Sequence, residues 1–303
     1  MALSTARDRA ARVCCIGEVM LEFAPCGGAR DYRLAYGGDT YNTAVYLARK
    51  GVAVEYLTAL GDDAFSDEIL AELRREGVRC DNVHRSVGQQ PGLYVISNDA
   101  DGERAFHYWR DSSPVRALFD GPMAPPRCEV VYFSGITLAV IRRGLDHFLA
   151  MLDTLRGRGA AIVMDCNYRA RQWASNAEAR EIYRQVLPRC DLLFSGVDDE
   201  CALWGDGEVE ASHARYRAAG ISEVLVRDSA LVTHLFTGGD YLSVRAERTS
   251  PVDTTGAGDA FNAACLAGRL QGLDWRAAIV AAQHLAARVV QARGAVIAPS
   301  AMD

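Results

Sequence analysis

The spacing of apolar residues along the chain predicts alternating strands and helices. Short runs rich in Val, Ile, Leu and Phe alternate with stretches that have the periodicity of amphipathic helices. A first strand is expected within 13–23, interrupted by Gly17, and strand–helix pairs follow at 54–60 and 65–76, 130–134 and 142–156, 161–165 and 177–187, and 192–195 and 200–204. Alternation of this kind is typical of βαβ units, in which the strands are parallel.

Two segments break the alternation. Residues 93–97 and 104–109 have strand composition and flank a turn-forming stretch, so they predict a β-hairpin, which we expect outside the main sheet as part of a lid. Residues 231–236 and 241–244 are expected as antiparallel strands at the edge of the main sheet.

Two long helices are expected at the end of the chain, at 260–270 and 275–292. No repeat, charge block or low-complexity linker divides the sequence. We therefore expect one α/β domain, 1–303, with lid strands from about 20–36 and 92–110.

Composition excludes several functions. The net charge of −6 argues against nucleic acid or an anionic membrane as a partner. Lys50 is the only lysine and lies at the end of a helical run, which excludes a P-loop and disfavours a Schiff-base aldolase. The nine cysteines form no C-x-x-C pair, so a zinc site is not expected. Since 1–12 lack the apolar core of a signal peptide and no apolar run reaches about 18 residues, we expect a cytoplasmic protein.

The stretch 253–261, Asp-Thr-Thr-Gly-Ala-Gly-Asp-Ala-Phe, carries the clearest chemistry. It places a Gly-x-Gly turn at the start of a long helix, where free backbone N–H groups and the helix dipole bind anions. By itself, Asp259 could equally be a helix cap. The stretch is not a dinucleotide-binding fingerprint, because Phe261 replaces the third glycine.

This stretch resembles the C-terminal signature of the ribokinase-like (PfkB-type) carbohydrate kinases, and Gly37-Gly38-Asp39-Thr40-Tyr41-Asn42 is similar to their N-terminal glycine pair and asparagine. The resemblance extends from Val13 to Ala295. It implies a three-layer α/β/α fold with a mostly parallel central sheet and a small β lid. It also implies ATP and Mg²⁺ as cofactors, admits a monovalent cation, and suggests a homo-oligomer formed through the lid.

The resemblance further implies roles for individual residues. Asp259 would be the catalytic base, and the backbone N–H groups of Gly256, Ala257 and Gly258 would stabilise the phosphoryl group in transit. The sugar would be bound by Gly38, Asp39 and Asn42, and the nucleotide by Ser195, Arg227, Thr254, Gly256 and Gly258.

Within the family, the middle of the chain is similar to the kinases of 2-keto-3-deoxygluconate, through Gly92-Leu93-Tyr94, Tyr108-Trp109-Arg110, Asp165-x-Asn167-Tyr168-Arg169 and Asp198-Asp199-Glu200-x-Ala202-Leu203-Trp204-Gly205. This implies phosphorylation of that sugar acid at its 6-hydroxyl. Arg110 and Arg169 would bind its carboxylate, since a guanidinium can donate two hydrogen bonds to a carboxylate. Tyr94 and Tyr108 would close over the sugar, or would be lid core.

The nucleotide side departs from the family pattern. Many members have an Asn-x-x-Glu motif near the metal, whereas this chain has Gly196-Val197-Asp198-Asp199, so we assign the acidic role to Asp199 or Glu200, acting through water. Arg227 stands where a lysine is usual. Nucleotide preference is therefore less defined by the sequence than the sugar site is.

Three other functions stay open at this stage. One is a kinase of the same fold that acts on fructose, a ketogluconate or a nucleoside. The second is an aldolase for keto-deoxy acids, and the third is a degenerate kinase that serves as a sugar-acid sensor. The base Asp259 together with both glycines favours an active kinase.

Overall fold

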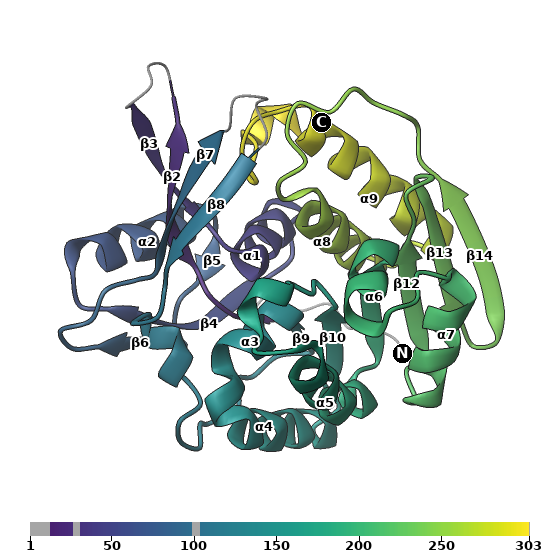
Figure 1. Cartoon of the computed structure of the whole chain (residues 1–303), viewed down its shortest axis with the longest axis horizontal. Helices are drawn as coiled ribbons and strands as arrows, with labels where there is room; N and C mark the ends of the chain where they lie inside the picture. The colour runs from purple at the N-terminus through teal and green to yellow at the C-terminus, as the bar shows by residue number, and fades with distance from the viewer. Residues whose placement is uncertain (1–12, 27–30, 99–103, 303) are drawn as a thin grey trace.

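The protein is built around one large sheet, which we describe from a computed structural model covering residues 13–26, 31–98 and 104–302. The ten strands follow the order β14-β13-β12-β11-β10-β9-β1-β4-β5, and β6 pairs with β4 (Figure 1). Their bounds are β1 Val13–Ile16, β4 Val54–Gly61, β5 Val78–Arg79, β6 Val83–Ser86, β9 Val130–Ser134, β10 Ala161–Asp165, β11 Leu192–Gly196, β12 Glu223–Arg227, β13 Val232–Thr237 and β14 Asp240–Arg245.

The strand pairings confirm the predicted mixed arrangement. All pairs from β5 to β12 are parallel, whereas β12 with β13 and β13 with β14 are antiparallel. The carboxyl ends of the parallel strands therefore lie along one edge of the sheet, which is where open α/β sheets bind ligands.

Helices cover both faces of this sheet. One face carries α1 Asp39–Arg49, α2 Ala64–Arg75, α8 Ala257–Leu270 and α9 Trp275–Val290, and the other carries α3 Gly135–Ile141, α4 Leu145–Gly157, α5 Asn176–Val186, α6 Val197–Trp204 and α7 Val209–Ala218. Along β1, Cys15 packs with the first set of helices and Cys14 with the second. Since successive strand residues face opposite sides, the sheet separates two apolar cores, and the result is the expected three-layer α/β/α fold.

A second, four-stranded sheet projects from this body and forms the lid (Figure 1). Its order is β3-β2-β7-β8, with β2 Met20–Pro25, β3 Tyr32–Gly37, β7 Leu93–Asn98 and β8 Arg104–Trp109. Strands β7 and β8 are antiparallel, as predicted, and β2 pairs in parallel with β7. The predicted turn between β7 and β8 lies largely outside the described residues.

Some elements differ from the predictions. The helix expected at 142–156 is preceded by α3, which starts at Gly135 because Ser134 and Thr137 form a capping box. Strands β5 and β6 were not predicted because they are short, and helix α7 was not predicted because its apolar residues are weakly periodic. Among the described residues, no helix is long and apolar enough to cross a membrane.

Candidate active site

A cavity of about 940 Å³ lies where the lid sheet, the carboxyl edge of the main sheet and the start of α8 meet. Its lining includes residues from the lid, from the first turn of α1, from the segment after β10 and from 254–259. Residues more than two hundred positions apart in the sequence thus face one space.

The start of α8 forms one end of the cavity. Gly256 has φ 77° and precedes the first helical residue, and a Cβ at this position would lie 2.5 Å from the carbonyl oxygen of Ala295. Both facts require glycine here. Gly256 and Gly258 line the cavity, whereas Ala257 does not, and its N–H donates to the carbonyl oxygen of Thr254 at 3.3 Å. Of the three predicted amides, those of the glycines are therefore better placed.

Asp259 lies in the first turn of α8, lines the cavity and is only 8% exposed. Its Oδ2 accepts a hydrogen bond from Nδ2 of Asn42 at 2.8 Å, which connects the starts of α8 and α1. Burial, and after it the negative charge of Asp39, raise the pKa of Asp259 well above its ordinary value. A carboxylate with a raised pKa is a stronger base, as proton abstraction from a hydroxyl requires.

Gly38 and Asp39 lie beside Asn42 at the start of α1, as the sequence predicted. Gly38 has φ 153°, and a Cβ there would lie 2.2 Å from the carbonyl oxygen of Glu18. The glycine thus allows the chain to cross from the lid into α1. The carboxylate of Asp39 accepts a hydrogen bond from Nδ2 of Asn167 at 2.8 Å.

Two tyrosines of the lid strands β7 and β8, Tyr94 and Tyr108, line the cavity. Tyr94 is buried and its hydroxyl donates to the carboxylate of Glu22. Tyr108 is 48% exposed, and its ring centroid lies 5.5 Å from that of Tyr94. Tyr94 is therefore both lid core and cavity wall, whereas Tyr108 is the more accessible of the two.

Both predicted carboxylate-binding arginines line the cavity and are already paired. Arg110, with a side chain 10% exposed, donates to Glu18, which is 3% exposed. Arg169, with a side chain 53% exposed, donates to Asp199 at 2.9 Å and also to the carbonyl oxygen of Tyr168. Nε of Arg110 and Oε1 of Glu18 are buried without a partner among the described residues. These pairs hold the two guanidinium groups in defined positions at the cavity wall.

Arg227 and Thr254 line the cavity close to the start of α8. Arg227 stacks over the ring of Phe261 at 4.9 Å, and its Nη1 lies 3.4 Å from the carbonyl oxygen of Gly258. Asp165 also lines this space, and burial raises the pKa of its carboxyl to about 7. The guanidinium of Arg227 therefore reaches the start of α8.

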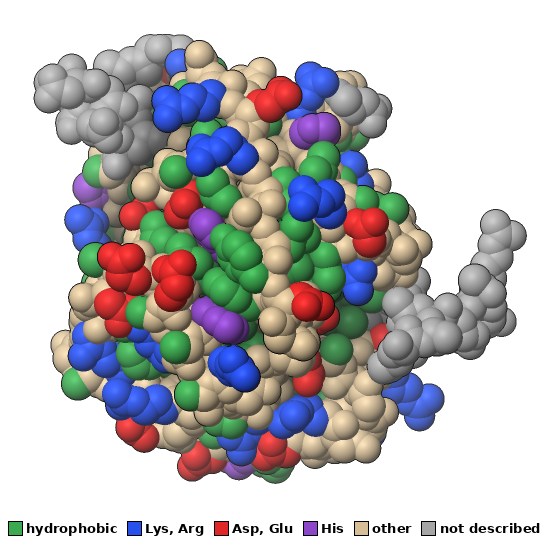
Figure 2. All heavy atoms as spheres, turned by 90° about the vertical axis from the view of Figure 1, so that its right-hand side faces the viewer, with side chains coloured by type: hydrophobic (Ala, Val, Ile, Leu, Met, Phe, Trp, Pro, Cys, Tyr) green, Lys and Arg blue, Asp and Glu red, His purple; other side chains and the backbone are tan. Residues whose placement is uncertain are grey.

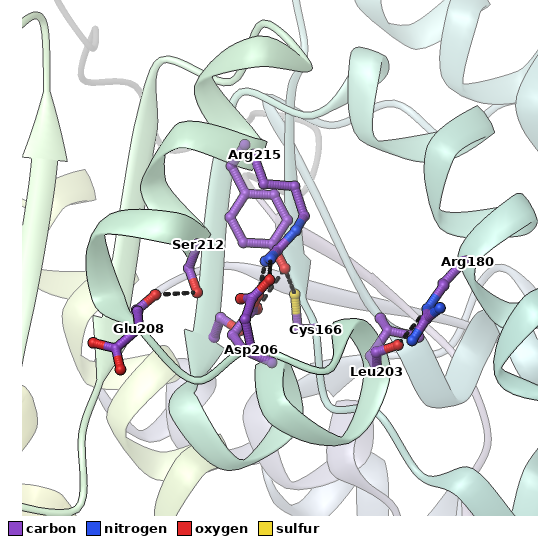
Figure 3. Close-up of polar contacts among 10 residues, drawn as sticks. Cys166, Arg180, Leu203, Asp206, Glu208, Ser212 and Arg215 are labelled. Carbon is purple, nitrogen blue, oxygen red and sulfur yellow. Dashed lines mark hydrogen bonds and ion pairs between the residues drawn. The ribbon is translucent and has the colours of Figure 1, made fainter.

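Ser195 and Glu200 do not lie in the cavity, so the predicted roles in nucleotide and metal binding do not fit their positions. Glu200 is 1% exposed and accepts hydrogen bonds from Ser195, Tyr216 and Arg215. Figure 3 shows Arg215 of this network pointing at Asp206. The sequence could not show which of Asp199 and Glu200 faces the cavity. The direction of each side chain depends on the residue at which α6 begins, Val197.

Asp199 remains in the cavity lining, where it accepts a hydrogen bond from Arg169. Among the residues described, no cluster of three His, Cys, Asp or Glu side chains could hold a metal by itself. Mg²⁺ usually takes one or two protein carboxylates together with waters and substrate phosphates.

Glu18, Asp165 and Asn167 also line the cavity, and Glu22 holds Tyr94 from outside the lining, but the sequence gave none of them a role. Asp165 and Asn167 could have been found, because both lie at or just past the carboxyl end of a predicted strand. Glu18 and Glu22 gave no such signal, since their partners Arg110 and Tyr94 come from distant positions in the lid.

Comparison with known proteins identifies the family. The family model of the pfkB carbohydrate kinases matches residues 10–301. The chain belongs to this family. It is 38% identical to the 2-dehydro-3-deoxygluconokinase of Escherichia coli, covering 96% of this chain and 98% of that protein. It is 37% identical to the protein of the same name from Dickeya dadantii, over 95% and 97% of the two chains. The predicted family is thereby confirmed.

Solved structures of the pfkB family share the fold. The fructokinase from Xylella fastidiosa with bound ATP superposes with a TM-score of 0.82 at 21% identity, covering 96% of this chain and 94% of that chain. The 2-dehydro-3-deoxygluconokinase from Thermotoga maritima gives a TM-score of 0.81 at 23% identity, covering 95% and 96%. These likenesses confirm the predicted fold.

Proposed function

We propose that this pfkB-family kinase transfers the γ-phosphoryl group of ATP to the 6-hydroxyl of 2-keto-3-deoxygluconate, giving 2-keto-3-deoxy-6-phosphogluconate. The observation that carries the proposal is the position of Asp259, a buried carboxylate with a raised pKa, at the start of α8 in a cavity lined with arginines. The same activity is named for relatives 34–38% identical over nearly the whole chain.

The chemical step follows from this placement. Asp259 takes the proton of the 6-hydroxyl as the sugar oxygen forms a bond to the γ-phosphorus. The bond from that phosphorus to the bridging oxygen breaks, and ADP leaves. Charge on the transferred group is stabilised by the amides of Gly256 and Gly258 and by the positive end of the α8 dipole. Asn42 holds the base in place through its hydrogen bond.

The carboxylate of the sugar acid would lie at the other end of the molecule, toward Arg110 and Arg169. In the chain as described, each guanidinium is held by one acidic partner, Glu18 or Asp199. A guanidinium has five N–H donors, so both arginines keep donors for a ligand. A neutral sugar would use none of this positive charge, which favours an acid as substrate.

Arg227 and Thr254 would contact the nucleotide phosphates, and Mg²⁺ bound with ATP would neutralise part of their charge. Asp199 is the residue that would hold waters of that ion. A monovalent cation stays part of the proposal without an assigned position.

Self-association through the lid is also part of the proposal. Two large aromatic side chains of the lid strands, Tyr32 and Trp109, are 44% and 60% exposed. A partner lid would cover such residues. Light scattering of the wild type and of Trp109→Glu would test this, since a purely surface role predicts no change of mass.

A coupled assay of ADP release across sugar acids and neutral sugars would test the proposed substrate. The panel should contain 2-keto-3-deoxygluconate, its galactonate epimer, 2-ketogluconate, fructose and a nucleoside. The highest kcat/KM is expected for a 2-keto-3-deoxy sugar acid, with phosphorus NMR placing the phosphate on the 6-oxygen. Faster turnover of fructose or a nucleoside would reject the proposal, and binding of the acid without any turnover would indicate a sensor.

A further inference from the structure

Asn167 has an unusual backbone conformation for its residue type. Two residues other than glycine have a positive φ in the described part of the chain, Asn167 at 30° and Leu231 at 61°. Such conformations are unfavourable for residues with a Cβ and persist only where the surroundings hold them. Leu231 is 42% exposed and lies outside the cavity lining, whereas Asn167 is 6% exposed and lies within it.

The side chain of Asn167 connects two separate parts of the site. Its backbone follows the carboxyl end of β10, and its Nδ2 donates to Oδ2 of Asp39 in the first turn of α1, at 2.8 Å. The two residues are 128 positions apart. A hydrogen bond from a neutral amide to a carboxylate is charge-assisted and directional, so it fixes how the carboxylate is turned.

We propose that Asn167 is a positioning residue of the sugar site, which holds one oxygen of Asp39 so that the other oxygen faces the bound sugar. The inference rests on the proposed function, because Asp39 is there assigned to the sugar hydroxyls. The strained backbone is what brings the amide from the end of β10 to α1. Relaxing that backbone would move the amide away from Asp39.

The orientation of Asp39 also affects Asp259, the proposed base. The charge of Asp39 is, after burial, the largest influence that raises the pKa of Asp259. The other charged groups that act on Asp259 are Asp165 and Arg169. The orientation of Asp39 therefore affects both sugar binding and the proton acceptor, and Asn167 sets that orientation.

Asn167→Gly is the first test, because glycine accepts the positive φ and lacks the amide. We expect KM for the sugar acid, and its Kd in calorimetry without ATP, to rise about ten-fold. KM for ATP should stay within about two-fold, and Tm should not fall, because the backbone strain is relieved. Leu231→Gly is the matched control for strain, and its Tm should likewise not fall.

A double-mutant cycle tests whether Asn167 acts through Asp39. In an Asp39→Ala background, Asn167→Gly should raise the Kd of the sugar acid no further. Additive losses in the two variants would overturn the proposal, since they would mean that Asn167 contacts the sugar independently of Asp39. An unchanged Kd for the single variant would overturn it as well.

Asn167→Asp supplies a readout that a merely structural role would not change. It keeps the size of the side chain and the tolerance of positive φ, but places a second carboxylate against Asp39. Added negative charge raises the pKa of neighbouring carboxyls, so the acidic limb of the kcat profile should move to higher pH, where Asp259 loses its proton. A limb at the wild-type position would contradict the proposal.

The wild type separates this inference from the proposed function. If it does not phosphorylate 2-keto-3-deoxygluconate, the proposed function fails, and the Asn167 variants are compared on the sugar that the panel identifies. If it does, and Asn167→Gly binds that sugar acid equally well, the inference fails alone.

Discussion

The two ends of the cavity are built in different ways. Beneath the lid, side chains are held by other side chains: Arg110 by Glu18, Tyr94 by Glu22, and Asp39 by Asn167. At the start of α8, the surface is backbone, exposed by Gly256 and Gly258. The end under the lid therefore depends on pairs of side chains, whereas the end at α8 combines exposed backbone with the side chains of Arg227 and Thr254.

This difference explains what each end can recognise. Paired side chains place charges and hydrogen-bond donors at fixed points, which suits a substrate with distinct hydroxyl and carboxyl groups. Backbone amides and a helix dipole bind any phosphate and do not distinguish the rest of the ligand. Specificity for the sugar should thus reside under the lid, and the general chemistry of phosphoryl transfer should reside at α8.

The face of the molecule at β13, β14 and α7 has a third kind of surface (Figure 2). Figure 2 shows apolar and histidine side chains gathered over β13, β14 and α7, where His213 stacks on Phe236 at 3.8 Å and Tyr241 lies 5.1 Å from that ring. These residues lie outside the cavity lining, and Tyr241 also bonds to His234 through its hydroxyl. They stabilise the edge of the main sheet.

The largest expected effect is at the junction of the two ends, in Asp259→Asn. The amide keeps the shape of the side chain but cannot accept the proton of the sugar hydroxyl. We expect kcat to fall by about 10²–10⁴ and sugar-acid binding to stay within a few-fold. Stopped assays of ADP release, with calorimetry for binding, measure both. Near-normal turnover would remove Asp259 from the mechanism.

Much of the fold and part of this site could be predicted from the sequence. Most parallel strands and the two hairpins were predictable because their apolar runs are short, dense and bounded by turn residues. The single strand expected within 13–23 was wrong, because β1 belongs to the main sheet and β2 to the lid. Gly256, Gly258 and Asp259 were predictable because a loop that opens a helix is a local feature. The helix α7 was not, since only Ser212 and Tyr216 of its ten residues are buried and its apolar face is small.

What the sequence could not give were contacts between distant segments. The pair of Glu18 with Arg110 joins residues 92 positions apart, and nothing local marks Glu18 as its partner. Likewise, Glu200 and Asp199 are adjacent and both acidic, yet the fold turns one into a buried network and the other into the cavity. Pairing and side-chain direction are properties of packing.

The next largest change is expected in KM for the sugar acid when an arginine under the lid is replaced. Charge-assisted hydrogen bonds contribute about 1.5–3 kcal/mol, so Arg169→Leu should raise KM for the sugar acid by about ten- to a hundred-fold. KM for ATP should change little. The matching sugar with a hydroxymethyl group in place of the carboxylate is the control, because the variant should weaken on the acid alone. Equal losses on both sugars would mean that Arg169 positions the phosphates or the lid.

Arg110→Leu should differ from Arg169→Leu in stability. Glu18 is 3% exposed and would be left as an unpaired buried charge, whereas Asp199 is 22% exposed and can be hydrated. Breaking a buried pair typically costs about 3–5 kcal/mol, and an exposed pair contributes about 0–1 kcal/mol. Urea unfolding of the two variants should therefore separate them clearly. Similar losses would contradict the different burial of the two pairs.

The glycines at the phosphate end should respond differently from each other. A Cβ at Gly256 meets the backbone of Ala295 at 2.5 Å and requires a left-handed conformation, so Gly256→Val should lower both Tm and kcat/KM. A Cβ at Gly258 meets only the end of the Arg227 side chain, at 3.3 Å. Gly258→Val should keep Tm and raise KM for ATP, as thermal melts and kinetics would show. A fully active Gly258→Val would refute the role of that amide.

The smallest change in activity is expected for variants of the neighbouring acids Asp199 and Glu200. They test whether Mg²⁺ depends on Asp199, which lines the cavity, or on Glu200, which is buried. Asp199→Asn should raise the Mg²⁺ concentration for half-maximal activity by only a few-fold, because a carboxylate that acts through water is partly replaceable by solvent. Glu200→Gln should leave that concentration unchanged. It should instead lower the free energy of unfolding by about 1–3 kcal/mol, because an amide cannot accept from Ser195, Tyr216 and Arg215 as the carboxylate does. Magnesium titrations and urea unfolding of both variants, run side by side, would distinguish them. The opposite result, a raised Mg²⁺ requirement in Glu200→Gln and none in Asp199→Asn, would mean that Mg²⁺ binding depends on the hydrogen bonds of Glu200. The assignment of Asp199 would then be wrong.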